Sequence, residues 1–167
     1  MAAAGRERPP IDWDSLTFSF TETDRMFVAN GSWEDGWSEG RMVDFQPLNL
    51  SPAACVLNYG QGLFEGMKAR RTPDGKITLF RPEMNARRAA EGARRLVMPE
   101  VSESMFIKAV KKVAEENKRW VPPHGKGELY LRPILFGSSA RLGVSPAEEY
   151  MFVVFACLLY TSDAADE

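Results

Sequence analysis

Tyr130 and Arg132 have the residue types and the spacing to bind an anion. They lie in residues 129–136, whose apolar composition predicts a β-strand. Successive side chains of a strand point to opposite faces, so residues two positions apart share a face. A phenol and a guanidinium on one face can together hold a carboxylate. The same pair is also common as a buried structural contact, and the residues alone leave both interpretations open.

A second candidate is the glycine-rich stretch over residues 58–68. It holds three glycines and two aromatic residues, namely Gly60, Gly62, Gly66, Tyr59 and Phe64. The order Gly-x-Gly-x-x-x-Gly differs from a dinucleotide-binding turn, and no Gly-Lys-Ser/Thr follows, so a nucleotide-binding loop is not supported. The stretch predicts either a segment of a site or, more simply, a glycine-rich turn that leads into a strand.

Composition argues against several other function classes. The chain of 167 residues is 44% hydrophobic and 26% charged, which is typical of one domain with a real core. A net charge of −2 argues against nucleic-acid binding, and no apolar run approaches the roughly 20 residues of a membrane span. Cys55 and Cys157 form no metal-ligand cluster, and a reducing compartment fits them. His124 is the only histidine, and no Gly-x-Ser-x-Gly elbow accompanies it, so a serine hydrolase is not supported.

The elements that must position these residues begin with strands. Alternating apolar residues at 16, 18 and 20 predict a half-buried strand within residues 11–27. Asn30-Gly31 is predicted to turn the chain, and another strand follows at about residues 41–45. Residues 67–70 and 77–80 flank Thr72-Pro73-Asp74-Gly75 and predict a hairpin.

Two helices are predicted next. The first begins at Pro82 and ends before Pro99, with small apolar residues at helical spacing: Ala86, Ala89, Ala90, Ala93 and Val97. Ser102 is predicted to cap the second helix. Its buried face consists of Phe106, Ala109, Val110, Val113 and Ala114, and its charged residues form a solvated face.

Two late strands complete the layered domain. Residues 150–157 form a continuous apolar run, as in a central strand that is covered on both sides. Pro133 restricts where the strand over residues 129–136 can lie in the sheet. Strands, then helices, then strands predict an α/β or α+β layered fold.

Five motifs occur in a specific order along the chain. They are YGQGLFEGMKA over residues 59–69, LFRP over 79–82, WVPP over 120–123, LYLRP over 129–133 and LGV over 142–144. In order and approximate spacing they resemble the branched-chain amino-acid aminotransferases, particularly the plant-like eukaryotic type, which are fold-type IV pyridoxal-phosphate enzymes. The resemblance covers residues 11–157. It implies the small N-terminal domain of such an enzyme, with a mixed or antiparallel sheet and two main helices.

The resemblance assigns a cofactor role to Arg88. It matches the arginine that grips the phosphate of pyridoxal 5'-phosphate in this family, a role suited to a permanent, fork-shaped cation. On a helical wheel Arg88 lies opposite the alanine stripe, where sequence alone predicts a solvated side chain. Arg87 is an adjacent competitor. No metal ligand is predicted.

The resemblance also assigns substrate contacts. Tyr130 and Arg132 match residues that meet substrate carboxylates. An apolar side-chain pocket matches Tyr59, Phe64, Phe18, Leu142 and Val144, of which the last two reach across from the partner subunit of a homodimer in the family. Without the resemblance, those five would be interpreted as core residues.

The two ends of the chain fit the family less well. Residues 1–10 are interpreted as a disordered lead, and residues 158–167 as a non-family tail of a truncated gene model. The resemblance places the lysine that carries the cofactor in a second domain, so no catalytic residue is assigned here. We expect the chain alone to be inactive and to self-associate. A cytoplasmic location is favoured, and a plastid or mitochondrion stays open if the N-terminus is incomplete.

The implied activity is transfer of an amino group between leucine, isoleucine or valine and 2-oxoglutarate, which yields glutamate. Two siblings on the same fold remain alternatives, a D-amino-acid transaminase and an aminodeoxychorismate lyase. Residues 64–69 and 120–123 weigh against both. A non-catalytic module that docks on a full-length enzyme is the alternative from another class.

Overall fold

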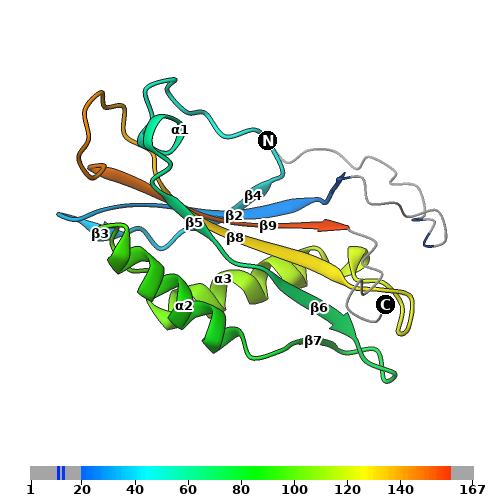
Figure 1. The fold of residues 1–167 in the computed structure, drawn as a ribbon. Coiled ribbons are helices and arrows are strands. Elements are labelled where there is room, and N and C mark those ends of the chain that lie inside the picture. The colour runs from blue at the N-terminus through cyan, green and yellow to red at the C-terminus, as the bar shows by residue number, and fades with distance from the viewer. Residues whose placement is uncertain (1–10, 12, 14–19, 159–167) are drawn as a thin grey trace, which may run out of the picture.

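The fold is organised around two long paired strands in the middle of an antiparallel sheet (Figure 1). The computed structural model describes residues 11, 13 and 20–158. β8 (Leu129–Gly137) and β9 (Glu149–Leu158) pair from Leu129 opposite Leu158 to Gly137 opposite Tyr150. The predicted strands at 129–136 and 150–157 are therefore confirmed, and the second is central and buried on both faces. The strand alternation predicted at residues 16 and 18 lies outside the described residues.

Shorter strands extend the sheet on both sides of this pair. β1 (Thr21–Glu22) and β2 (Arg25–Ser32) pair with β9, and β3 (Gly36–Trp37) and β4 (Arg41–Asp44) pair in turn with β2. On the other side, β5 (Gly62–Phe64) and β6 (Met67–Arg71) pair with β8, and β7 (Ile77–Leu79) pairs with β6. The predicted β6–β7 hairpin is confirmed, with Gly75 at a φ of 84° in its turn.

Two helices cover one face of the sheet, and the short α1 (Cys55–Tyr59) lies toward the other face (Figure 1). α2 (Pro82–Arg95) begins at the predicted proline. α3 (Glu103–Glu116) is capped by Ser102, whose hydroxyl accepts a hydrogen bond from the Met105 amide at 3.2 Å. A single 3₁₀ turn, η1 (Lys118–Trp120), follows. The predicted fold class is confirmed as a layered α/β arrangement with an antiparallel sheet.

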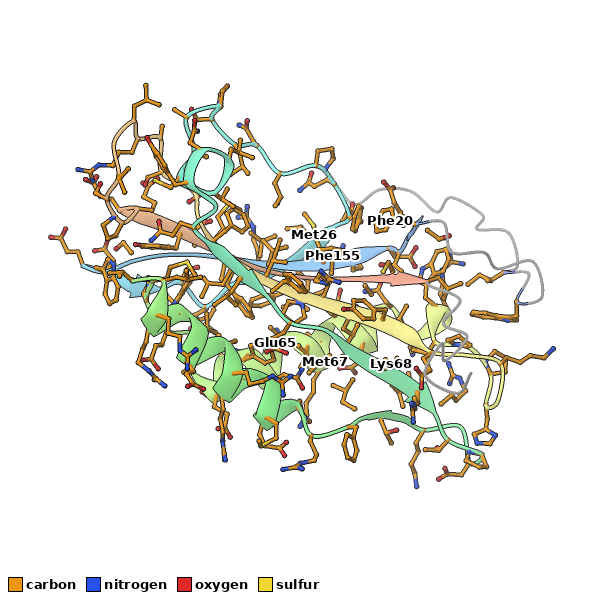
Figure 2. The ribbon with its side chains drawn as sticks, viewed as in Figure 1. Phe20, Met26, Glu65, Met67, Lys68 and Phe155 are labelled. Carbon is orange, nitrogen blue, oxygen red and sulfur yellow. The ribbon has the colours of Figure 1, made fainter. Side chains whose placement is uncertain are left out.

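The main core lies between the helices and the sheet. Phe106 of α3 is buried against Phe152 of β9, with ring centroids 5.7 Å apart, and Phe27 of β2 contacts the same ring at 6.1 Å. All five predicted core positions of α3 are buried. A second cluster lies on the opposite face, where Phe45 and Phe155 are in ring contact. Figure 2 shows that face, with Met26 and Phe155 labelled.

The predicted turn at Asn30-Gly31 is wrong. Both residues lie inside β2 and pair with β9, where Gly31 is opposite Tyr150. The glycine is needed for close approach, because a Cβ on Gly31 would lie 2.6 Å from the Trp37 ring. The chain turns a few residues later, between β2 and β3.

The prediction for Val97 is also wrong. α2 ends at Arg95, and Val97 lies beyond it with a φ of 51° and a side chain that is 52% exposed. A left-handed conformation is unfavourable for a β-branched residue, so the backbone here is strained. The other four predicted apolar positions lie within α2.

Pro133 lies at a break in the neighbouring strand. Its carbonyl accepts a hydrogen bond from the Glu65 amide at 2.9 Å, and Glu65 and Gly66 are the two residues between β5 and β6. A residue without an N–H is tolerated inside β8 because the ladder on that side is interrupted at this point. The break also lets the chain change direction beside Tyr130 and Arg132.

Asn117 joins the end of α3 to β2. Its side chain is fully buried, and its Oδ1 accepts hydrogen bonds from the Asp24 and Arg25 amides, both at 3.0 Å. Its Nδ2 donates to the carbonyls of Arg25 at 2.9 Å and Val113 at 2.8 Å. One amide side chain therefore satisfies four backbone groups from two distant segments.

We predict that Asn117→Ala lowers the free energy of unfolding by about 3 kcal/mol, because it leaves several backbone groups without a partner. Urea denaturation measures the change. Asn58→Ala is the matched control, since the exposed Asn58 side chain also donates to two backbone carbonyls, at 2.9 and 3.1 Å. We expect it to cost less than about 1 kcal/mol. Equal losses in the two variants would contradict the role assigned to Asn117.

Candidate functional site

Tyr130 and Arg132 lie on one face of β8, beside the break between β5 and β6. A Cβ on Gly66 would overlap the Tyr130 hydroxyl, so glycine is required for the ring to lie there. Arg132 Nη2 donates to the Tyr130 hydroxyl at 2.9 Å. The predicted common face of the two side chains is therefore observed, and they are in direct contact.

Arg132 is also stacked on two aromatic rings. Its guanidinium carbon lies 4.4 Å from the Phe64 ring centroid and 5.1 Å from that of Tyr130. Its Nε is buried and has no hydrogen-bond partner among the described residues. Phe64 itself is 66% exposed. The Arg132 guanidinium is therefore held in one orientation with its Nε–H still unpaired in the described structure, and the exposed Phe64 ring lies against it.

Arg88 lies on α2 and is held by Glu65. Its Nε donates to Oε1 of Glu65 at 3.0 Å and its Nη2 donates to Oε2 at 2.7 Å. Asn85, one turn earlier on α2, donates to the same Oε2 at 2.8 Å and to the Gly66 carbonyl at 3.1 Å. The hydrogen bond with Glu65 raises the pKa of Arg88 above its ordinary value. Glu65 is labelled beside α2 in Figure 2.

The sequence did not point to Glu65 and Asn85 as members of this cluster. Asn85 is 7% exposed and Glu65 has a largely buried side chain. One feature of the sequence could have indicated this cluster. Asn85 lies in the first turn of α2 on the face that is otherwise alanine, and a buried polar side chain needs a hydrogen-bond partner. The partner, however, comes from a segment twenty residues away, and its position depends on the β5–β6 break.

A cleft of about 690 Å³ opens where β6 and β7 meet the start of α2. Both Arg88 and Tyr130 line it, which brings the predicted phosphate ligand and one predicted carboxylate ligand into one cavity. Three further cations line the cleft: Lys68, Arg70 and Arg81. Glu128 pairs with two of them, with Lys68 Nζ at 2.6 Å and with the Arg70 side chain. Arg81 pairs with Glu83 at 3.6 Å and Arg88 with Glu65, so the four cations have three carboxylate partners in the described chain and the cleft keeps a small excess of positive charge.

Tyr59, Leu142 and Val144 lie away from this cleft. Leu142 and Val144 are on the β8–β9 connection, at the end of the sheet opposite the β6–β7 hairpin (Figure 1). Their side chains are 81% and 94% exposed. The Tyr59 hydroxyl accepts a hydrogen bond from the Gly143 amide at 2.6 Å, so Tyr59 belongs to this loop group.

The interpretation of the apolar candidates as core residues is wrong. Phe64, Leu142 and Val144 are exposed, and Tyr59 is 42% exposed. They lie on the glycine-rich stretch and on a connection, where a large part of each side chain stays exposed. Phe18 lies outside the described residues.

Two buried groups, Cys157 and Tyr150, have raised pKa values. Burial raises the pKa of the Cys157 thiol, which is partly opposed by the Arg132 cation. Burial also raises the pKa of the Tyr150 hydroxyl, which accepts from Trp33 Nε1 at 3.1 Å and donates to the Ala147 carbonyl. The part of the chain that the structure describes contains no group of three or more metal-ligating side chains. None of its helices is long and apolar enough to cross a membrane.

The sequence matches plant aminotransferases. It is 51% identical to methionine aminotransferase BCAT4 of Arabidopsis thaliana over 147 residues and 51% identical to branched-chain-amino-acid aminotransferase 1, mitochondrial, of the same plant over 149 residues. The matches cover 88% and 89% of this chain but only 42% and 39% of those proteins. The chain thus spans about two fifths of the length of these relatives. No family model matches.

The fold matches solved aminotransferases. The branched-chain amino acid aminotransferase of Escherichia coli aligns over 81% of this chain and 40% of its own, with a TM-score of 0.63 and 20% identity. The branched-chain amino acid aminotransferase of Thermobaculum terrenum, solved in its pyridoxal-phosphate form, aligns over 81% of this chain and 40% of its own, with a TM-score of 0.58 and 14% identity.

The described residues therefore have the fold of the N-terminal domain of fold-type IV aminotransferases. Within that class, the sequence is related to the plant branched-chain amino-acid aminotransferases over most of its length.

The raised pKa of Tyr150 predicts a pH dependence of stability. A tyrosine whose folded pKa exceeds its unfolded value, near 10, stabilises the fold fully below pH ~10 and loses that contribution as the pH rises through the folded pKa. We expect the wild-type stability to fall more steeply above pH ~10 than that of Tyr150→Phe. Urea midpoints across this range measure the difference. Parallel curves would show that Tyr150 ionises normally.

Proposed function

We propose that this chain supplies the cofactor-phosphate and substrate-carboxylate side of the active site in a pyridoxal-phosphate-dependent branched-chain aminotransferase. The observation that carries the proposal is that Arg88 and Tyr130 line one cationic cleft while Arg132 contacts Tyr130 from the next outward position of β8. The relatedness to plant enzymes supports the same reaction class. The reaction would transfer an amino group between leucine, isoleucine or valine and 2-oxoglutarate.

Arg88 is the residue that we propose to hold the cofactor phosphate. Glu65 engages its Nε and Nη2, which orients the guanidinium and leaves Nη1 for another acceptor. The surrounding cations favour a dianionic group. Pyridoxal phosphate, when bound, supplies an electron sink for the amino-acid α-carbon. We assign no lysine of the described residues the role of carrying it.

Tyr130 and Arg132 are the residues that we propose to meet substrate carboxylates. The buried and unpartnered Nε of Arg132 fits an acceptor that only a bound ligand would supply. The Phe64 ring beside it is apolar and accessible. One pocket could then accept a leucine side chain against Phe64 and a glutamate side-chain carboxylate at Arg132.

Tyr59, Leu142, Val144 and Phe18 complete the proposed apolar pocket. The exposure of Leu142 and Val144 supports a contact with something other than their own chain. We propose a second subunit of a homodimer, in which this loop reaches the partner's site. A docking module without its own chemistry would also expose such residues, but it would have no need of the Arg88 cleft.

The proposed pocket suits more than one apolar amino acid. Identity is 51% to a plant methionine aminotransferase and 51% to a branched-chain aminotransferase. Methionine and leucine both present an unbranched Cβ and an apolar side chain, so Phe64 would serve either one.

Two substitutions test the division of roles. They are made in a chimera in which residues 11–157 replace the matching segment of a plant branched-chain aminotransferase. Arg88→Ala is expected to weaken pyridoxal-phosphate binding by roughly ten- to a hundredfold and to leave the preference between leucine and glutamate unchanged. Arg132→Ala is expected to raise the KM for glutamate and 2-oxoglutarate selectively, because leucine's side chain does not use the cation.

Each variant has a matched control. Arg87→Ala removes the adjacent exposed arginine, which pairs with Glu103 at 3.2 Å. Arg119→Ala removes an arginine that is likewise stacked on an aromatic ring, 4.5 Å from the Trp120 centroid. Equal loss of leucine and glutamate turnover in both site variants, with unchanged cofactor affinity, would make both arginines structural.

A further inference from the structure

The β8–β9 connection, residues 138–148, is hydrogen-bonded to residues 53–61 at several points. Backbone bonds join Arg141 to Ala53 at 2.9 Å and Ser139 to Cys55 at 3.1 Å, and two side chains add further ties. Near its tip the Gly143 amide donates to the Tyr59 hydroxyl at 2.6 Å. At its base the Ala147 amide donates to Gln61 Oε1 at 2.9 Å. The two anchoring side chains, Tyr59 and Gln61, are two residues apart in sequence, at and just after the end of α1. The tie at the tip and the tie at the base therefore both depend on where the backbone of this short segment lies.

Gln61 is in turn fixed to the opposite layer of the fold. Its Nε2 donates to the Leu96 carbonyl at 3.0 Å and the Val97 carbonyl at 3.3 Å, and its own carbonyl accepts from the Gly137 amide at 3.0 Å. The Gln61 side chain thus joins the end of α2 to the base of the connection, while its backbone carbonyl bonds the end of β8. The side-chain amide donates through Nε2 and accepts through Oε1. A side chain with only donors or only acceptors could not make both kinds of hydrogen bond.

The surroundings leave this amide little freedom. A Cβ on Gly137 would lie 2.7 Å from Gln61 Oε1 and 2.7 Å from the Ala147 Cβ, so the glycine leaves room for the contact. Val97, which receives one of the hydrogen bonds, has its strained φ of 51°. The Tyr150 hydroxyl lies 3.3 Å from the same Val97 carbonyl. Strain of this kind persists only where neighbouring contacts hold it in place.

We propose that Gln61 is a positioning residue that holds the β8–β9 connection against the end of α2 and so presents Leu142 and Val144 in one fixed geometry. This inference deepens the proposed function, since it rests on those two side chains forming part of an apolar substrate pocket. Residues of an exposed connection can line a pocket only if the connection is held in place. A loose loop would have to become ordered when substrate binds, which lowers the affinity and the specificity for that substrate.

Three variants of the 167-residue chain test the proposal. Gln61→Met keeps the side-chain length and removes every hydrogen bond of the side chain. Gln61→Glu keeps an acceptor for the Ala147 amide and removes the donor to Leu96 and Val97 near neutral pH. Tyr59→Phe removes only the bond at the tip. Hydrogen exchange of the Ala147 and Gly143 amides reports the tie at the base and the tie at the tip separately.

We expect Gln61→Met to accelerate exchange of the Ala147 amide about tenfold, while central β8 and β9 amides keep their wild-type rates. Gln61→Glu should retain protection at Ala147, because the carboxylate still accepts from that amide. Tyr59→Phe should accelerate exchange at Gly143 alone. Trypsin cleavage after Arg141, within the connection, should quicken in Gln61→Met relative to cleavage after Lys126.

Unchanged exchange at Ala147 in Gln61→Met would overturn the proposal. So would an equal acceleration throughout β8 and β9, because that result marks a general loss of stability and no specific positioning. These readouts involve neither cofactor nor substrate. A failure here would leave the roles of Arg88 and Arg132 intact, and a failure of those roles would leave the ties made by Gln61 intact.

Discussion

The register between β8 and β9 is the constraint on which the site depends. Side chains of a strand alternate between faces, so the pairing that buries Leu129, Leu131 and Leu135 against the helices also turns Tyr130 and Arg132 to the other face. A shift by one residue would bury the guanidinium and expose the leucines. The hydrophobic energy of the helix-side core therefore fixes the orientation of the polar residues. Pro133 adds to this constraint, because it requires a break in the neighbouring strand, and the break holds Glu65 and Gly66.

Local sequence signals predicted the elements well and the contacts between them less well. The β6–β7 turn, the proline at the start of α2 and the Ser102 cap each act through neighbouring residues, so they could be identified directly. Asn30-Gly31 resembled a turn for the same local reason, but pairing with β9 overrides it. The common face of Tyr130 and Arg132 follows from strand periodicity alone. The support of Arg88 by Glu65 and Asn85 does not, since it joins segments about twenty residues apart across a strand break.

Both ends of α2 carry unusual backbone conformations. Arg81 before the helix has a φ of 45° and Val97 after it has a φ of 51°, and these are the non-glycine residues with positive φ among those described. Arg81 lines the cationic cleft, and Val97 accepts a hydrogen bond from Gln61. Strained residues concentrate where function requires a particular geometry. The helix thus serves as a rigid spacer between the proposed phosphate site at its first turns and the proposed support of the apolar loop at its end.

The most direct test of the central proposal is a crystal structure of the chimera with pyridoxal phosphate bound. We predict the phosphate in the cleft between β6 and α2, with Arg88 Nη1 at about 2.7–3.2 Å from a phosphate oxygen and Glu65 still bonded to the other side of the guanidinium. A phosphate bound elsewhere, with Arg88 bonded to Glu65 alone, would contradict the assignment of this cleft to the cofactor.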